Sequence, residues 1–505
     1  MSDLEYPQRL SRSILWELQR RFFAAEGIDA WRKGVVPCYI TSNPFVAQAY
    51  SRVVGGFVRD CLANGALIDH DQPMYIIELG AGSGRFAYHF LKEFLPSVES
   101  CGRNHLRLKY IMTDFASRTI EFWDAHPSLE PLVARGHLAF ARFDAGHDRA
   151  ITLYGSEETL APGTIRNPIV VLANYFFDSI PQDLFRIEGG ELHEQLISVF
   201  APDGEVDLDE PDALGRVQIA FDSRQISDGY YGDPMLDELL QDYRRRLTDA
   251  VLSFPCAAIQ CIRDLSRLSG EHMLLMAADQ GYSSQEELLG KEQPVIQLHG
   301  SVSMEVNYHA LGEYVLKRGG QVYHAGRRPV SLNVSCFVLG YGPAETPETR
   351  RAFDDAVALF GPDDFFVLKT GFERAYRCLD LPNTLEYLRL TGYDADIFAG
   401  TFPTLLNLVD SCTEEEREEL RQVLQQVWAA YYPIGEGLDL PFRIGVLLYR
   451  TGWYREALEF FRHSEKLHGP HSATYYDMGM CHYMLGELEL AQACVDEARG
   501  IDPEC

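Results

Sequence analysis

Positive charge is scarce in this sequence of 505 residues. It contains 45 lysines and arginines against 74 aspartates and glutamates, which gives a formal net charge of −29. An acidic surface repels the phosphates of nucleic acids and of anionic membranes, so we expect neither as a partner. The charge is compatible with a basic protein or a cationic small molecule as substrate, and equally with a simple role in solubility.

Paired cysteines and long apolar runs are also missing. The 11 cysteines are scattered singly, and the closest two, Cys256 and Cys261, do not form a CxxC motif. This spacing argues against a zinc site, and without a secretory signal it favours reduced thiols. No apolar run approaches the roughly 20 residues that a membrane helix needs. We therefore expect a cytoplasmic protein with neither a metal site nor a membrane span.

A glycine-rich turn is the most specific feature that the sequence does contain. The apolar segment 75–77 ends at a carboxylate and is followed by glycines at alternate positions, Gly80, Gly82 and Gly84. A dinucleotide fingerprint, GxGxxG, would need glycine where Arg85 stands, and no GxxxxGK[ST] phosphate loop occurs. The form E-x-G-x-G-x-G resembles the first motif of class I S-adenosylmethionine (SAM) methyltransferases.

Segments typical of strands and helices alternate from about residue 75 to residue 339. This alternation predicts a mostly parallel sheet with helices on both faces, a Rossmann-like α/β fold. A Gly-Gly pair at residues 189–190 interrupts the alternation and predicts a β-hairpin insertion. The predicted strands cover residues 74–79, 108–113, 137–143, 168–173, 195–200, 272–277 and 332–339. The predicted helices cover residues 9–32, 84–95, 117–125, 234–252 and 307–318.

The C-terminal part contains an internal repeat. Gly445 matches Gly479 and Ala457 matches Ala491, and each pair is 34 positions apart. This is the period of tetratricopeptide repeats, which are pairs of helices. We therefore expect an all-α, tetratricopeptide-like region here. Upstream of it, a capping box at Thr413 predicts a helix within a helical connecting region.

Residues at successive strand ends are candidates for binding SAM, because ligands of open α/β sheets lie outside the carboxyl ends of the strands. Glu78 would support the ammonium of SAM, and Asp114 would accept its ribose hydroxyls, although a helix cap before Ser117 is an alternative role. Phe143 and Asp144 would contact adenine. The predicted cofactor-binding residues are Glu78, Gly80, Ala81, Gly82, Gly84, Asp114, Phe115, Phe143, Asp144 and Asn174.

The end of the fourth strand is the candidate for the chemistry of methyl transfer. This reaction needs an aligned nucleophile with a free lone pair more than it needs a strong acid. An Asn oxygen or an Asp carboxylate can orient an amine and accept its proton. Ordinary turn and core roles are the alternatives for the same residues. The predicted catalytic residues are Asn174, Tyr175, Asp178, Asp279 and Tyr282.

Several blocks, in order, resemble the MidA-type SAM-dependent methyltransferases, which include a mitochondrial complex I assembly factor that methylates arginine. The resemblance extends from about residue 36 to residue 340 and implies a methyltransferase fold with SAM as cofactor. The blocks are Thr41–Pro44, Glu78–Gly84, Asn174–Pro181, Asp279–Tyr282 and Val302–Leu311.

The departures from the family pattern surround the expected acceptor pocket. Tyr175 stands where the family has glutamate, Gln280 where it has tyrosine, and Leu192 where it has tryptophan. A guanidinium group favours a carboxylate that binds it with two hydrogen bonds, so the change at Tyr175 argues against an arginine acceptor. The resemblance therefore implies the same cofactor with an altered acceptor.

The sequence predicts a SAM-dependent methyltransferase that modifies a nitrogen or oxygen atom, on a protein or peptide docked by the C-terminal repeats. A small-molecule methyltransferase and a non-catalytic scaffold or assembly factor are the alternatives, and the repeats also allow a homodimer. The predicted domains are an N-terminal helical segment (1–35), a methyltransferase domain (36–345) with an insertion at about 185–235, a helical connecting region (346–440) and tetratricopeptide-like repeats (441–505).

Overall fold

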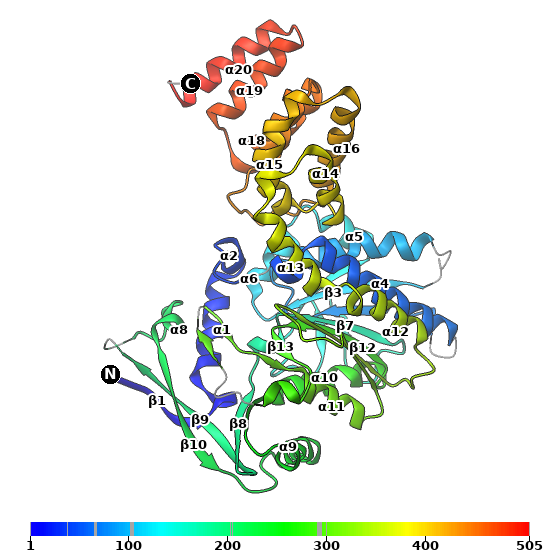
Figure 1. Cartoon of the computed structure of the whole chain (residues 1–505), viewed down its shortest axis with the longest axis vertical. Coiled ribbons are helices and arrows are strands. Elements are labelled where there is room, and N and C mark those ends of the chain that lie inside the picture. The colour runs from blue at the N-terminus through cyan, green and yellow to red at the C-terminus, as the bar shows by residue number, and fades with distance from the viewer. Residues whose placement is uncertain are drawn as a thin grey trace. The chain divides into compact units, whose positions relative to one another are not determined.

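The structure is a computed structural model (Figure 1), and within it the chain divides into two compact units, Met1–Val367 and Leu368–Cys505. The finer domain boundaries given above stay predictions. The model describes residues 2–37, 39–64, 68–100, 106–202, 204, 206–289, 295–298 and 300–503.

Continuous apolar runs form the main sheet of the first unit. Its strands lie in the order β17 (Gln321–His324), β18 (Asn333–Leu339), β12 (Met273–Asp279), β7 (Ile169–Asn174), β2 (Met74–Glu78), β3 (Leu108–Asp114), β4 (Leu138–Arg142), β5 (Ile151–Leu153) and β6 (Thr159–Leu160). The five strands from β12 to β4 pair in parallel, and the strands at both edges are antiparallel. The central strands are buried because helices cover both faces. The predicted α/β fold is confirmed.

The side chains of successive residues in each strand point to opposite faces of this sheet. The first unit contains the helices α1 (Ile14–Glu26), α2 (Asp29–Arg32), α4 (Pro44–Ala63), α5 (Arg85–Ser100), α6 (Ser117–Asp124), α7 (Glu130–Ala134), α9 (Pro234–Arg246), α10 (Cys256–Ser266) and α11 (Tyr308–Lys317). On one face, α9, α10 and α11 pack with Ile77, Ile111 and Val171 in a single apolar cluster. On the other face, where α4 and α5 lie, Phe90 contacts Tyr110 with 5.6 Å between ring centroids. Figure 1 shows both layers.

A second, antiparallel sheet contains the predicted hairpin. Its strands are β1 (Ser2–Arg9), β8 (Asp183–Glu188), β9 (Glu191–Ala201), β10 (Gln218–Gln225) and β11 (Ala250–Phe254). Gly189 and Gly190, with φ of 57° and 80°, form the turn of the β8–β9 hairpin, as predicted. Two predictions are wrong. Residues 2–9 are a strand instead of a helix because they pair with β9, and the helix predicted over 234–252 ends at Arg246 because β11 pairs with β8.

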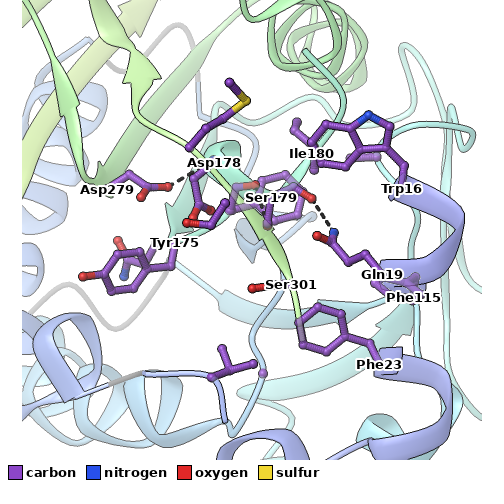
Figure 2. Close-up of a pocket in the computed structure, with 18 of the residues that line it drawn as sticks. Trp16, Gln19, Phe23, Phe115, Tyr175, Asp178, Ser179, Ile180, Asp279 and Ser301 are labelled. Atoms are coloured by element: carbon purple, nitrogen blue, oxygen red, sulfur yellow. Dashed lines mark hydrogen bonds between the residues drawn. The ribbon is translucent and has the colours of Figure 1, made fainter. Parts of the chain in front are cut away.

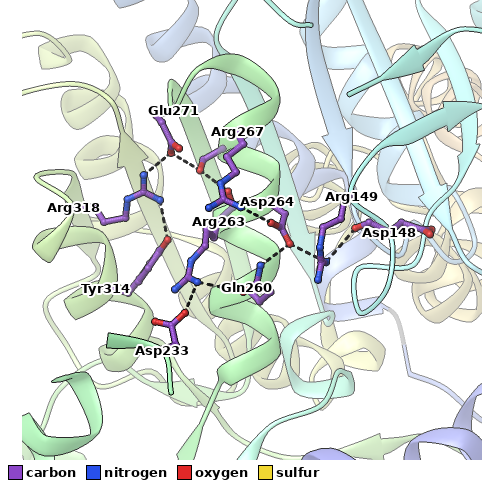
Figure 3. A network of polar contacts seen from close by, with 11 residues as sticks. Asp148, Arg149, Asp233, Gln260, Arg263, Asp264, Arg267, Glu271, Tyr314 and Arg318 are labelled. Atoms are coloured by element: carbon purple, nitrogen blue, oxygen red, sulfur yellow. Dashed lines mark hydrogen bonds and ion pairs between the residues drawn. The ribbon is translucent and has the colours of Figure 1, made fainter. Parts of the chain in front are cut away.

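Ion pairs fix α10 against its neighbours (Figure 3). Arg263 pairs with Asp233, the residue that caps α9, with 2.5 Å between Nη1 and Oδ2. Asp264 pairs with Arg149, from the segment before β5, with 2.8 Å between Oδ2 and Nη1. Each partly exposed pair contributes at most about 1 kcal/mol, so the network orients α10 more than it stabilises it.

The second unit is helical. Its main helices are α14 (Leu381–Leu390), α15 (Ala395–Leu408), α16 (Glu414–Ala430), α17 (Leu440–Arg450), α18 (Tyr454–His468), α19 (Ser472–Met484) and α20 (Leu488–Ile501). The capping box predicted at Thr413 is present at the start of α16. The last four helices pack as two pairs, α17 with α18 and α19 with α20, and α18 and α20 begin 34 residues apart.

The repeated glycines lie where paired helices meet. A Cβ on Gly445 would come within 2.7 Å of the Phe461 ring, and one on Gly479 within 3.2 Å of the Ala491 carbonyl oxygen. Glycine therefore permits the close approach of the helices in both pairs. The helix pairs are a finding, and the tetratricopeptide identity itself stays a prediction. In the described part of the chain, no helix is long and apolar enough to cross a membrane.

Candidate active site

The glycine-rich turn joins β2 to α5 in conformations that favour glycine. Gly80, Gly82 and Gly84 have φ values of 59°, 54° and 79°, in the left-handed region that a Cβ disfavours. A Cβ on Gly80 would come within 2.9 Å of the Phe176 ring, and one on Gly82 within 2.8 Å of the Trp31 ring. Both backbone strain and lack of space therefore require glycine at these two positions.

The turn borders a cavity of about 1000 Å³ at the carboxyl ends of the parallel strands, part of which Figure 2 shows. Open α/β sheets bind their ligands at this edge. Tyr282, a predicted catalytic residue, does not line the cavity, and its hydroxyl lies 3.1 Å from Ser253 Oγ in the core. Gly84 also lies outside the lining. The predicted residues that do line it are Glu78, Gly80, Ala81, Gly82, Asp114, Phe115, Phe143, Asp144, Asn174, Tyr175, Asp178 and Asp279.

Two buried carboxyl groups lie at the ends of β2 and β3. Tyr110 donates a hydrogen bond of 2.9 Å to Glu78 Oε2, and burial raises the pKa of Glu78 to about 8. Asp114 Oδ1 accepts a bond of 2.9 Å from the backbone N–H of Ala116, and burial raises the pKa of Asp114 to about 6. This bond ties Asp114 to Ala116, the residue that precedes α6, so both predicted roles of Asp114, at the ribose and at the start of this helix, stay predictions. A cationic ligand group would stabilise both carboxylates.

Asn174 ends β7 with its amide nitrogen unpaired. Tyr50 donates a hydrogen bond of 2.8 Å to Asn174 Oδ1, while the buried Nδ2 has no partner within the described residues. The oxygen expected to accept a proton is therefore already engaged, and the amide offers a donor instead. The next residue, Tyr175, has a φ of 47°, which is unusual for a residue with a side chain. Strain of this kind gathers at functional sites.

Asp178 and Asp279 form a buried carboxyl pair (Figure 2). The parallel register of β7 and β12 aligns Asn174 with Ala278, which brings the loop after β7 to the end of β12. Asp279 Oδ2 accepts a hydrogen bond of 3.2 Å from the backbone N–H of Asp178. Burial raises the pKa of Asp178 to about 6, and burial together with the Asp178 charge raises the pKa of Asp279 further. Burial therefore raises the pKa of both members of the pair above the ordinary value of an aspartate.

The N-terminal helices also line the cavity, and no pattern in the sequence indicates this contact. The residues involved are Trp16, Gln19, Arg20 and Phe23 of α1 and Trp31 of α2. Gln19 donates a hydrogen bond of 2.7 Å to the Ser179 carbonyl and accepts one of 2.7 Å from the backbone N–H of Val302. The apolar spacing of α1 predicts a helix, but it does not indicate which element that helix will cover.

Part of the chain matches the model of a known family. Residues 132–322 match the family described as "Putative S-adenosyl-L-methionine-dependent methyltransferase". This match covers less than half of the chain, and it supports a SAM-dependent methyltransferase as the enzyme class. The matched segment extends from α7 to β17 and includes the carboxyl pair, and the glycine-rich turn precedes it. The predicted enzyme class and cofactor are thus confirmed.

Solved structures similar to the methyltransferase are remote in sequence. One is a "likely methyl transferase" from Burkholderia thailandensis bound to S-adenosyl-homocysteine, with 15% identity and a TM-score of 0.41 over 66% of this chain and 88% of that chain. Another is 1,6-didemethyltoxoflavin-N1-methyltransferase from the same organism, with 10% identity and a TM-score of 0.29 over 67% of this chain and 92% of that chain. No curated protein matches the methyltransferase.

The turn provides a direct test of where the cofactor binds. We predict that Gly82→Ala weakens the binding of S-adenosylhomocysteine by at least about tenfold, because the new methyl group strains the backbone and displaces Trp31. Isothermal titration calorimetry measures the effect. Gly136→Ala is the matched control, since Gly136 also has a positive φ of 75° but has open space around it. Equal affinity in the two variants would contradict this placement of the cofactor.

Proposed function

We propose that the chain transfers the methyl group of SAM to a nitrogen or oxygen atom of a protein or peptide. The observation that carries the proposal is the buried Asp178–Asp279 pair, which lines the same cavity as the glycine-rich turn. An N–H or O–H nucleophile loses a proton when it is methylated. A carboxylate whose pKa lies near neutrality is a suitable acceptor for that proton.

The residues of the cavity fit SAM. Gly80 and Gly82 permit close approach to the backbone, and Asp114 would accept the ribose hydroxyls. Glu78 would face the ammonium group, and the unpaired Nδ2 of Asn174 would donate a hydrogen bond to the ligand. When bound, SAM supplies a methyl group on a cationic sulfur. Side chains of this chain orient the acceptor and take its proton.

The two members of the carboxyl pair have different roles in this proposal. Asp178 is ionised and takes the proton of the nucleophile. Asp279 holds the Asp178 backbone by accepting the hydrogen bond from its N–H. Tyr175 lines the same cavity without adding a carboxylate, which supports an acceptor other than a guanidinium group.

The second unit supports a protein or peptide as the acceptor. We infer that its last four helices are tetratricopeptide-like, since glycines 34 residues apart lie at equivalent helix contacts. Stacked helix pairs of this kind offer extended surfaces for peptides. Large apolar side chains exposed on α19 and α20 would be covered by such a partner, and they are Tyr476, Tyr483, Met484, Leu488 and Leu490.

A small molecule is the second candidate acceptor, because the cavity of about 1000 Å³ has room for more than the cofactor. Incubation of a cell extract with the enzyme and tritiated SAM, followed by separation of the products by size, distinguishes the two. We predict that label appears in the macromolecular fraction. Label in the small-molecule fraction alone would replace the protein acceptor, and label in neither would favour the scaffold alternative.

The carboxyl pair predicts unequal effects of two conservative substitutions. Asp178→Asn removes the proton acceptor and should lower kcat by about 10²- to 10⁴-fold. Asp279→Asn keeps an oxygen that accepts the hydrogen bond from the Asp178 backbone and should lower kcat by less than about tenfold. Steady-state kinetics on the labelled acceptor fraction measures both values, and calorimetry with S-adenosylhomocysteine shows whether the cofactor still binds. A larger loss in Asp279→Asn would reverse the assigned roles.

The raised pKa of Asp178 predicts a dependence on pH. Activity should rise with pH through about 6, because the proton acceptor must be ionised.

Stability should change in the opposite direction. A buried acid with a raised pKa stabilises the fold most below its ordinary value, and this contribution is lost as the pH rises through about 6. Asp178→Asn should therefore melt no lower than the wild type at pH 8, as differential scanning calorimetry would show.

A further inference from the structure

Arg20 of α1 contacts two of the predicted cofactor-binding residues, Phe115 and Asp144. Its guanidinium carbon lies 5.3 Å from the centroid of the Phe115 ring. Its Nη2 forms an ion pair with Asp144 Oδ2 and lies 3.1 Å from His147 Nδ1. The other oxygen of Asp144 accepts a hydrogen bond of 3.0 Å from the backbone N–H of Gly146. Both carboxylate oxygens are therefore engaged while Arg20 is in this place.

Arg20 and adenine have the same requirements. Adenine needs a flat apolar surface for its ring and an acceptor for its amino group. Asp144 is the acceptor predicted from the sequence, and the Phe115 ring, which lines the same cavity, is such a surface. A guanidinium group is likewise planar, stacks on aromatic rings and donates hydrogen bonds in its own plane. In this cavity, Arg20 satisfies the two side chains as an adenine ring would.

Contacts at both ends of the cavity hold α1, the helix that carries Arg20. Gln19 connects α1 to Ser179 and Val302, as described above. Phe23 contacts the Phe115 ring edge-on at 6.2 Å between centroids and stacks on Trp31 at 5.7 Å. The position of Arg20 is thus set by a helix that contacts both the acceptor side and the cofactor side.

We propose that Arg20 competes with adenine for Phe115 and Asp144, so that SAM binds by displacing it and S-adenosylhomocysteine leaves as it returns. The inference rests on the placement of SAM in the proposed function. Arg20 then weakens the binding of both cofactor forms, because each must break the ion pair and the ring contact. It favours release of the product by the same means.

Calorimetric titration of the full chain with S-adenosylhomocysteine tests the competition. Arg20→Ala should bind about three- to tenfold more tightly than the wild type, which is the effect of losing one partly exposed ion pair and one cation–π contact. Arg21→Ala is the matched control on the same helix, because Arg21 does not line the cavity and pairs with Glu17 and Asp209 instead of Asp144. Its affinity should stay within about twofold of the wild type.

The outcomes separate this inference from the proposed function. Failure of the wild type to bind S-adenosylhomocysteine would overturn the proposed function. A wild type that binds, with Arg20→Ala binding equally well or more weakly, would overturn only the competition, and weaker binding would make Arg20 part of the cofactor site. Arg20→Gln, which keeps the helix and a neutral donor, serves if the alanine variant does not fold. It should also bind more tightly than the wild type.

Discussion

The candidate site depends on the parallel register between β7 and β12. This pairing sets Asn174 opposite Ala278, and the backbone N–H of Tyr175 then donates a hydrogen bond of 2.8 Å to the Ala278 carbonyl. The chain after β7 is thereby directed across the end of β12, where Asp178 meets Asp279. A shift by one residue would turn every side chain of the strand to the opposite face and separate the pair. Helices bury both faces of this sheet, so the register between its strands is strongly determined.

The cavity gathers acidic groups whose charges have few partners. Carboxylates from the ends of five parallel strands and their loops face the same space, and burial raises the pKa of Glu78, Asp114 and Asp178. Such a site favours ligands that bring positive charge or hydrogen-bond donors and disfavours anions. A sulfonium cofactor meets this requirement. The acidic residues of the cavity thus affect which molecules enter it.

Local patterns predicted the local parts of this architecture. The apolar runs of β2, β3, β7 and β12 and the glycines after Glu78 were readable because strand burial and positive φ leave their mark within a few residues. Long-range pairing was not readable. Residues 2–9 and 250–254 became strands only because β9 and β8 offered them free edges, and no short segment records its partner. For the same reason, the spacing along α1 revealed a helix but not that Arg20 would enter the cavity.

The bond between Gln19 and Val302 spans 283 residues of sequence. Synthesis on the ribosome proceeds from the N-terminus, so α1 emerges long before the segments that cover its buried face, which includes Leu15, Trp16, Leu18 and Phe22. At roughly 5–20 residues per second, this face waits tens of seconds for its partners. The nascent chain therefore carries an exposed apolar helix for much of its synthesis. A chaperone that binds the chain early in synthesis would bind this helix first. A truncation that ends before residue 302 would leave the helix without the partner of Gln19.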